Sequence, residues 1–353
     1  MKKSLLALAV LGAFAGAASA QSSITLSGLV DVGVKKVSSQ TAGADSTAFA
    51  NNNTGTSAVF FKGTEDLGSV KAGFLLELDI NPVSSSLANT DPTKGGQAFS
   101  GTPFNGEQFV SLAGAFGEVK LGTPNAAALT ASSTSQPFGT ALGSAFSAGF
   151  GRLGTQSVSG VNQYVGNGTG RIIRNEKTVV YSTPSFAGLK GTLEYSFKND
   201  NSATPASNNN GYTSVALSYN QGPANVIVVS AKVAAGDTNP AAGSANTTTT
   251  TAVNSALAIK QSVRFNLLGA NYTFGAATVY AGLTTTKGDP ETIENSASRN
   301  LAVKFAVSPQ VDLMANYLKR DNKLAANPTV DANLLGLGVD YKLSKRTTVY
   351  ARY

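Results

Sequence analysis

The chain has 353 residues and a formal net charge of +7, with charged side chains at 13% of its positions, whereas about a quarter is usual in a soluble domain. It contains no Cys, which excludes a disulfide framework and thiol chemistry, and no His, which removes the commonest metal ligand and general base. A chain with so few charges must cover its apolar groups by something other than a charged surface in water.

The start of the chain has the pattern of a secretory signal peptide. Lys2 and Lys3 form a charged start, residues 5–14 form a short apolar run, and Ala18-Ser19-Ala20 is a small-residue cleavage site. The apolar run is shorter than the roughly 18 residues of a membrane-spanning helix, and a buried N-terminal helix is the less favoured interpretation. We therefore expect residues 1–20 to be a signal peptide and the mature chain to be exported.

Alternation of apolar and polar residues then recurs along the chain. It is clear in residues 24–35, 70–80, 189–198, 300–307 and 335–342. A period of two over about ten residues is typical of a strand, and its repetition with one polar face is typical of a transmembrane barrel. The sequence therefore predicts an all-β fold, an antiparallel transmembrane β-barrel that extends over residues 21–353.

The connections between these segments are of two kinds. Short turns rich in Gly, Pro, Asp or Ser fall at residues 65–69, 115–117, 183–188, 220–223, 308–310 and 343–346. Long polar segments fall at residues 38–55, 81–105, 124–171, 199–210, 234–254 and 287–296. Short turns on one rim and long loops on the other are typical of barrels in the bacterial outer membrane.

The long segment 124–171 is unusual in its charge. Between residues 119 and 175 the chain contains the three arginines Arg152, Arg171 and Arg174 and no Asp or Glu. Connections longer than about 15 residues are usually functional or disordered, and such a segment can fold into a barrel and narrow its pore. We expect residues 124–171 to be a constriction loop, and its positive charge favours anions in the pore.

Several segments resemble the general porins of β-proteobacteria. The matching segments occur in the family's order and together cover residues 21–353. The resemblance implies a homotrimer of 16-stranded barrels, each with a water-filled channel that its third long loop constricts. The segments that carry it are Gln21-Ser22-Ser23-Ile24-Thr25-Leu26, Gly63-Thr64-Glu65-Asp66-Leu67-Gly68 with Lys71-Ala72-Gly73-Phe74, Phe116-Gly117-Glu118-Val119-Lys120-Leu121-Gly122, Tyr181-Ser182-Thr183-Pro184, and Leu343-Ser344-Lys345-Arg346-Thr347.

The number of strands departs from the family's pattern. Alternation gives about 15 strands, the last at residues 347–353, whereas family members continue to a final strand that closes the barrel. Because bacterial single-chain barrels have even strand numbers, we expect a gap between the first and last strands, with a strained parallel closure as the alternative. A truncated sequence is the simplest explanation, and a miscounted strand is the other.

The arginine ladder that lines the family's constriction is also thinned. At three of its positions this chain has Ala58, Gly106-Glu107 and Thr123, whereas Lys62 and Arg174 match. Arg152 and Arg171 are open to a second interpretation, as solvated loop charges. The candidate constriction residues are Lys62, Glu107, Lys120, Arg152, Arg171 and Arg174, and the other candidate lumen charges are Asp31, Lys71, Glu77, Asp79 and Glu118. Glu107 and Glu118 would oppose the positive potential.

No sequence pattern indicates catalysis. The chain has no Gly-x-Ser-x-Gly and no phosphate-binding glycine loop, and Glu77 with Asp79 is more simply a pair of wall charges than a glycosidase pair. We expect a porin rather than an enzyme, located in the outer membrane of a Gram-negative bacterium. It should be weakly anion-selective and homotrimeric, and should contact outer-membrane lipid, lipopolysaccharide and small solutes, with no cofactor and no nucleic acid.

Two other functions stay open on the sequence alone. The first is a substrate-specific channel, against which the scarcity of lumen aromatics (Phe60, Phe109 and Tyr350) argues weakly. The second is an exported all-β adhesin domain, against which the apolar outward strand faces argue more strongly.

Overall fold

The computed structural model describes residues 22–38, 45–83, 104–139, 141–144, 155–158, 161–164, 173–197, 211–233, 262–289, 295–322 and 331–353. The expected signal peptide, residues 1–20, lies outside these ranges. In the part of the chain that the structure describes, no helix is long and apolar enough to cross a membrane.

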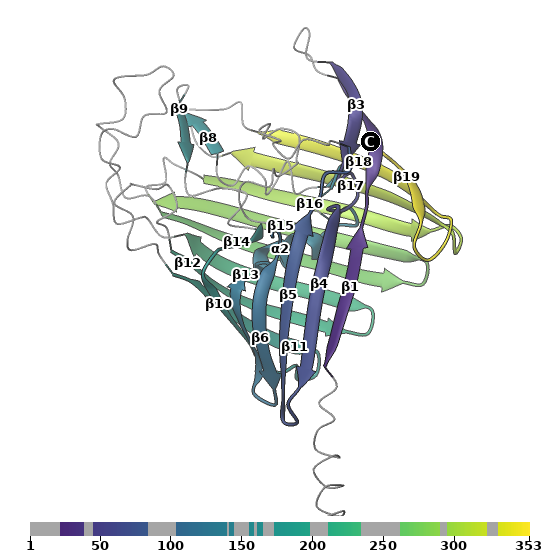
Figure 1. Ribbon diagram of the computed structural model, residues 1–353. Helices are drawn as coiled ribbons and strands as arrows, with labels where there is room; N and C mark the ends of the chain where they lie inside the picture. Colours follow the sequence, from purple (N-terminus) through teal and green to yellow (C-terminus); the bar gives the residue numbers. More distant parts are fainter. Residues whose placement is uncertain are drawn as a thin grey trace, which may run out of the picture.

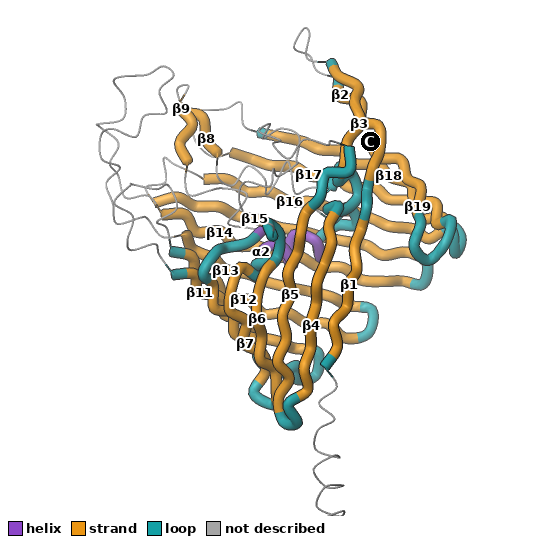
Figure 2. Tube along the Cα trace, in the orientation of Figure 1, coloured by secondary structure: helices purple, strands orange, loops and turns teal. Residues whose placement is uncertain are grey.

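Fifteen strands form one antiparallel sheet that curls round on itself (Figure 1, Figure 2). In spatial order they are β1 (Ser23–Leu29), β4 (Ala58–Asp66), β5 (Val70–Asp79), β6 (Gln108–Gly114), β7 (Gly117–Thr123), β10 (Thr178–Ser182), β11 (Leu189–Ser196), β12 (Tyr212–Gln221), β13 (Ala224–Val233), β14 (Ser262–Phe274), β15 (Ala277–Asp289), β16 (Asn295–Ala306), β17 (Val311–Asn322), β18 (Ala332–Lys342) and β19 (Thr348–Arg352). Two small hairpins pair β2 (Val32–Val37) with β3 (Ser46–Asn51) and β8 (Thr155–Val158) with β9 (Val161–Tyr164). In the described part of the chain, helix α2 (Ala127–Thr134) lies within the curl of the sheet (Figure 2).

The two faces of the sheet differ as the alternation predicts. We call the face that carries α2 the inner face and the other the outer face. The inner face of β11 to β17 buries polar side chains such as Glu194, Ser214 and Asn316. Large apolar side chains are exposed on the outer face, among them Leu193, Val215, Leu217, Val228, Leu283, Leu301, Phe305, Leu313, Leu335 and Leu337.

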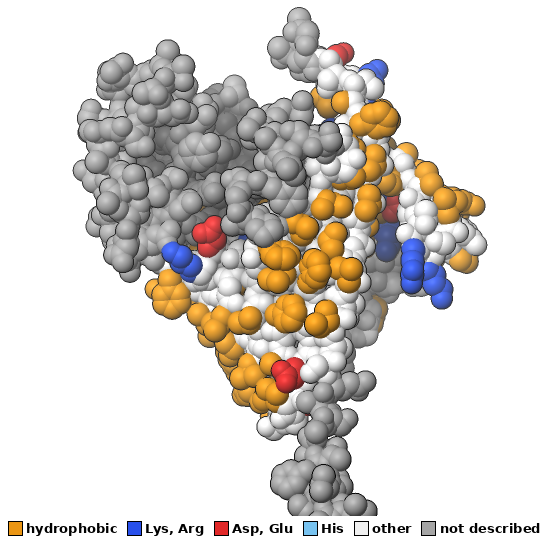
Figure 3. Space-filling view, viewed as in Figure 1, with side chains coloured by type: hydrophobic (Ala, Val, Ile, Leu, Met, Phe, Trp, Pro, Cys, Tyr) orange, Lys and Arg blue, Asp and Glu red, His pale blue; other side chains and the backbone are white. Residues whose placement is uncertain are grey.

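Apolar side chains also gather on the outer face of β1, β4, β5 and β6 (Figure 3). Soluble monomers rarely expose apolar surface on this scale, because its contact with water is unfavourable. A sheet that is apolar outside and polar inside is the arrangement of a transmembrane barrel. The all-β barrel fold expected from the sequence is therefore confirmed.

The first strand is shorter than the sequence predicts. β1 ends at Leu29, and β2 leaves the main sheet to pair with β3, so the prediction of one continuous strand over residues 24–35 is wrong. The break falls at Asp31, which is buried and accepts hydrogen bonds from the backbone N–H groups of Thr54 (2.5 Å) and Gly55 (3.1 Å). These bonds turn the chain toward residues 54–55 and away from β4. The segment 38–55, expected to be a loop, contains β3.

β1 and β19 stand at the two ends of the strand order. β1 pairs with β4 and β19 pairs with β18, and the described residues of β1 and β19 form no ladder with each other. The expected gap between the first and last strands is therefore present, and the fifteen strands of the main sheet match the number that alternation gives.

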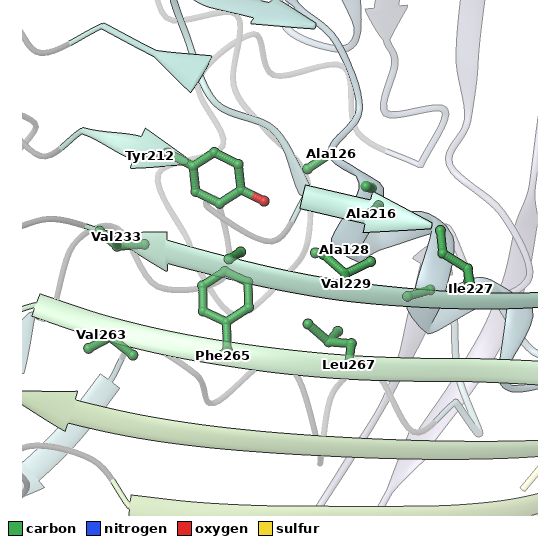
Figure 4. Close-up of a cluster of buried hydrophobic side chains, with 13 residues drawn as sticks. Ala126, Ala128, Tyr212, Ala216, Ile227, Val229, Val233, Val263, Phe265 and Leu267 are labelled. Carbon is green, nitrogen blue, oxygen red and sulfur yellow. The ribbon is translucent and has the colours of Figure 1, made fainter. Parts of the chain in front are cut away.

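Helix α2 packs against the inner face of β12, β13 and β14. Its Ala127, Ala128 and Ala131 belong to the same buried cluster as Val229 and Phe265, from β13 and β14 (Figure 4). The alanine side chains are small enough for the helix to approach the sheet closely. This part of the inner face is apolar because the helix covers it, whereas a water-filled lumen calls for a polar wall.

Candidate functional site

The candidate site lies where residues 124–171 leave and rejoin the sheet. The segment begins directly after β7, and Arg174 follows it shortly before β10. The register places Lys62 of β4, Glu77 of β5 and Lys120 of β7 on the inner face. Lys62 stands opposite Leu75, Glu77 stands opposite Phe60, and Lys120 stands opposite Ser111. The exposed Val110 lies on the other face. The alternation of the strands thus brings charges from three elements to one wall.

Glu77 and Arg174 form an ion pair at the base of the segment. Arg174 donates from Nη1 to Oε2 of Glu77 at 3.0 Å, and Glu77 is buried. The same oxygen accepts a hydrogen bond of 2.5 Å from the backbone N–H of Glu107. Since the carboxylate is paired with a cation and hydrogen-bonded, it contributes little net negative potential to the lumen.

Glu107 holds the first residues of the segment in place. Its two carboxylate oxygens accept hydrogen bonds from the backbone N–H and from Nδ2 of Asn125, each at 2.9 Å. Asn125 in turn forms an isolated antiparallel bridge with Arg174, and the N–H of Ala126 donates to the carbonyl of Ile173 at 2.8 Å. The outgoing and returning ends of the segment are therefore side by side, and both wall acids contact them.

Lys62 and Lys120 are the other cations of this wall. Lys120 Nζ lies 3.8 Å from a carboxylate oxygen of Glu118 and 4.5 Å from the ring centre of Phe109. Lys62 is exposed and forms no ion pair with any residue that the structure describes. Lys62 is thus the least compensated cation of the group.

The segment that starts at Pro124 then crosses the inner face of the sheet. Glu194 of β11 accepts a 2.7 Å hydrogen bond from the N–H of Ala127, where a carboxylate also stabilises the positive end of the helix dipole. Asn271 donates to the carbonyl of Thr134 at 2.9 Å, and Asn300 donates to that of Ser135 at 2.8 Å. Side chains of β11, β14 and β16 therefore hold one continuous stretch of backbone against the inner wall.

Two glycines allow this backbone to approach the wall. A Cβ on Gly269 would stand 2.1 Å from the carbonyl oxygen of Ala131, and one on Gly336 would stand 2.1 Å from that of Gly143. Real Cβ atoms do not approach other atoms so closely, so any other residue at either position would push the segment inward. Residues 126–139 and 141–143 thus lie along the wall from β11 to β18.

Other predicted lumen charges have different surroundings. Lys71 and Asp79 share the inner face of β5 with Glu77, at its two ends, and Glu118 stands near the turn that precedes β7. Asp31 is buried between β1 and β2, and its partners are Thr54, Gly55 and Tyr350 and not the other predicted lumen charges. Burial raises the pKa of Asp31, but hydrogen bonds from Tyr350, Thr54 and Gly55 lower the pKa to below its ordinary value. Arg152 and Arg171 lie outside the described residues.

Sequence reasoning missed the residues that fasten the segment to the wall. Asn125 and Glu194 are both essential to the geometry, yet Asn125 is an ordinary loop residue and Glu194 an ordinary strand charge in the sequence. Gly269 and Gly336 carry one available signal, because a glycine inside a strand often marks a close backbone approach.

Comparisons with known proteins identify the family of the chain. Residues 7–353 match the family model of the Gram-negative porins. The outer membrane porin protein 32 of Delftia acidovorans is 32% identical over 361 residues, which cover 99% of this chain and 88% of the relative. An outer membrane porin protein of Bordetella pertussis is 27% identical over 387 residues, 99% of this chain and 93% of the relative.

Solved structures show the same fold. The anion-selective porin from Comamonas acidovorans superposes with a TM-score of 0.73 at 25% identity, over 94% of this chain and 88% of that one. OmpT of Vibrio cholerae in a trimer form superposes with a TM-score of 0.60 at 15% identity, over 94% and 87% of the two chains, which supports the fold alone. The chain therefore belongs to the Gram-negative porin family, and it is an outer-membrane channel for passive diffusion and not an enzyme.

Proposed function

We propose that the channel is weakly anion-selective and that residues 124–171 form its constriction. The observation that carries the proposal is the ion pair between Arg174 and Glu77, together with the bonds that occupy Glu107 at the base of the segment. Glu77 and Glu107 would otherwise attract cations, but these contacts occupy their carboxylates. The solved porin from Comamonas acidovorans, described as anion-selective, adds support by similarity.

The balance of charge explains why we propose weak selectivity. On the inner faces of β4, β5 and β7, the three cations Lys62, Lys71 and Lys120 face the four acids Asp66, Glu77, Asp79 and Glu118, so the charges of these strands alone do not favour anions. The segment from residue 124 to residue 171 adds Arg152 and Arg171 without any acid. Charges that line a narrow part of a pore set which ions pass, and low-dielectric walls focus their potential.

The test is the reversal potential of the purified protein in planar bilayers under a tenfold gradient of KCl. We expect the sign that marks preference for chloride. Arg174→Glu replaces a cation by an acid beside Glu77, so it should move the reversal potential toward the potassium side. The shift should shrink at high salt, where charges are screened over shorter distances.

Lys190→Glu is the matched control. Lys190 also faces inward but lies at the turn end of β11, opposite Ser218 and away from the base of the segment. The same change of charge there should shift the reversal potential less than Arg174→Glu does. A wild-type channel that prefers potassium would overturn the proposal, and so would equal shifts in the two variants.

We propose further that the molecule is a homotrimer surrounded by outer-membrane lipid and lipopolysaccharide, and that small ions and solutes are what it conducts. The resemblance to general porins and the trimer form of Vibrio cholerae OmpT support this assembly. Light scattering on the processed protein in detergent, after correction for bound detergent, should give three times the mass of one processed chain, which is the 35.9 kDa of the full sequence less the mass of residues 1–20. A mass of one chain would contradict it.

A further inference from the structure

Two phenylalanines and a leucine lie partly exposed on the inner wall of β4, β5 and β6. Phe60 stands opposite Glu77 on that face, and the register places Leu75 directly opposite Phe109. Apolar side chains on the inner face of β12 to β14 belong instead to the buried cluster that α2 covers (Figure 4). The lumen wall of a water-filled barrel is polar, whereas binding sites for small molecules are lined mainly by apolar groups with a few polar ones. Partly exposed apolar side chains on this wall therefore favour contact with a solute.

Lysine side chains stand on both sides of this apolar surface. Lys62 lies directly opposite Leu75, and Nζ of Lys120 lies 4.5 Å from the ring centre of Phe109. Side chains directly opposite one another in an antiparallel pair have Cβ atoms about 5 Å apart, so Lys62, Leu75 and Phe109 form one continuous row. Phe60 is the diagonal neighbour of Leu75 on the same face. We call Phe60, Lys62, Leu75, Phe109 and Lys120 the Lys–Phe patch.

Lys62 is the cation of the Lys–Phe patch that can attract a solute most strongly. Lys120 has a carboxylate oxygen of Glu118 at 3.8 Å, whereas Lys62 is exposed and has no ion pair within the described ranges. The nearby acid Glu77 is occupied by Arg174 at 3.0 Å. A carboxylate that reaches the patch therefore meets an ammonium group beside an apolar surface.

We propose that the Lys–Phe patch is a binding subsite for aromatic carboxylates, the chemical class of benzoate. The carboxylate lies at Lys62, and the ring lies over Leu75 between the rings of Phe60 and Phe109. The row spans two strand spacings, about 10 Å, which is wide enough for a ring that carries a carboxyl group. Aromatic rings attract one another in offset and edge-to-face arrangements, and the ring of the solute leaves water as it binds. The inference rests on the proposed function, a pore that admits anions, and adds the class of solute that its wall retains.

The test measures block of the ionic current by added solutes in single channels of the purified protein, in planar bilayers at 0.1 M KCl. A solute that binds in the pore interrupts the current, and the concentration that gives half of the maximal block measures its affinity. Benzoate is compared with acetate, which has the carboxylate without the ring, and with benzyl alcohol, which has the ring without the charge.

We expect benzoate to block at about one tenth of the concentration at which acetate blocks, the gain when roughly half of the surface of a phenyl ring leaves water. Benzyl alcohol should need a concentration about three to five times that of benzoate, because it lacks the attraction between opposite charges about 4 Å apart.

Two variants locate the binding subsite. Lys62→Gln should raise the half-blocking concentration of benzoate about three- to fivefold, and Lys62→Arg should retain the wild-type value. Leu75→Gln should raise the benzoate value about tenfold, to that of acetate, because the ring loses its apolar contact.

The matched controls make the same changes elsewhere on the inner face. Lys190→Gln alters β11, five strands from β4 in the order of the sheet, and Leu334→Gln alters β18, opposite Leu318. Both should keep the half-blocking concentration of benzoate within about twofold of wild type, because distant charges are screened and apolar contacts are short in range.

Equal block by acetate and benzoate in the wild type would overturn the inference, because the ring would then contribute nothing, and this comparison requires no variant to fold. Block by benzyl alcohol as strong as that by benzoate would also overturn it, since Lys62 would then have no role. A loss of benzoate block in Leu334→Gln as large as in Leu75→Gln would place the binding elsewhere. The reversal potential in KCl alone, measured on the same channels, tests the proposed function separately. Preference for potassium combined with the expected benzoate block would refute the selectivity and support the subsite.

Discussion

Glu77→Gln tests whether the acids at the base of the proposed constriction segment, residues 124–171, limit anion selectivity. Glu77 accepts hydrogen bonds from Arg174 at 3.0 Å and from the N–H of Glu107 at 2.5 Å. A glutamine amide oxygen can accept both, so the local structure should survive while one negative charge disappears. Arg174 would then act on passing ions without its counter-charge, and preference for chloride should increase.

The size of the increase follows from Coulomb's law. An elementary charge about 5 Å from a passing ion in water contributes roughly 0.8 kcal/mol, and screening at 0.1 M lowers this to about 0.5 kcal/mol. Removal of the negative charge stabilises chloride by the same amount as it destabilises potassium. The free-energy difference between the two ions therefore changes by about 1 kcal/mol, or about fivefold in the permeability ratio. At 1 M, where the screening length is about 3 Å, the increase should fall below about twofold.

The assay is again the reversal potential, measured at both salt concentrations. Glu65→Gln is the matched control, because Glu65 lies on the outer face of β4 near the turn and loses the same charge away from the lumen. An unchanged permeability ratio in Glu77→Gln would refute the reasoning. A fivefold change that persists at 1 M would also refute it, because it would show that the aperture had changed and not the potential.

Three further predictions concern the segment and the wall. Deleting residues 131–160 should raise single-channel conductance, and a folded mutant with unchanged conductance would show that this segment does not narrow the pore. Gly269→Val should displace α2, because a Cβ there would lie 2.1 Å from a helix carbonyl, and should change conductance and raise current noise, whereas Ala270→Val on the outer face should do neither. Leu301→Arg, at an outer position that is 70% exposed, should cost roughly 2–4 kcal/mol of unfolding free energy in lipid, as measured by denaturant titration, and Ala302→Arg on the inner face should cost much less.

The barrel could be predicted from the sequence because the alternation that identifies each strand is a local pattern. A period of two identifies a strand and its lipid side without knowledge of the partner strand, and Leu193 beside Glu194 or Leu301 beside Asn300 shows this in the structure. The prediction of a single strand over residues 24–35 failed because the break at Asp31 depends on Thr54 and Gly55, which are distant in sequence.

The candidate site could be predicted only in part. Lys62, Glu107, Lys120 and Arg174 were found from charge and from the family resemblance, and the structure brings Glu107 and Arg174 together at Glu77. The pairing itself could not be foreseen, because it joins residues 97 positions apart through the return of a long segment. Which wall strand receives α2 was equally hidden, since an alanine-rich helix carries no signal for its partner.

The apolar patch beneath α2 has a consequence for how the protein is assembled. Val229, Phe265 and Leu267 point into what becomes the lumen, and they are dry only because the helix lies on them. If the sheet curled before the helix docked, these apolar side chains would face water in the lumen. Exposure of apolar side chains to water is unfavourable. We therefore expect helix docking and curling of the sheet to occur together, so that α2 already lies against the inner wall when the channel enters the membrane.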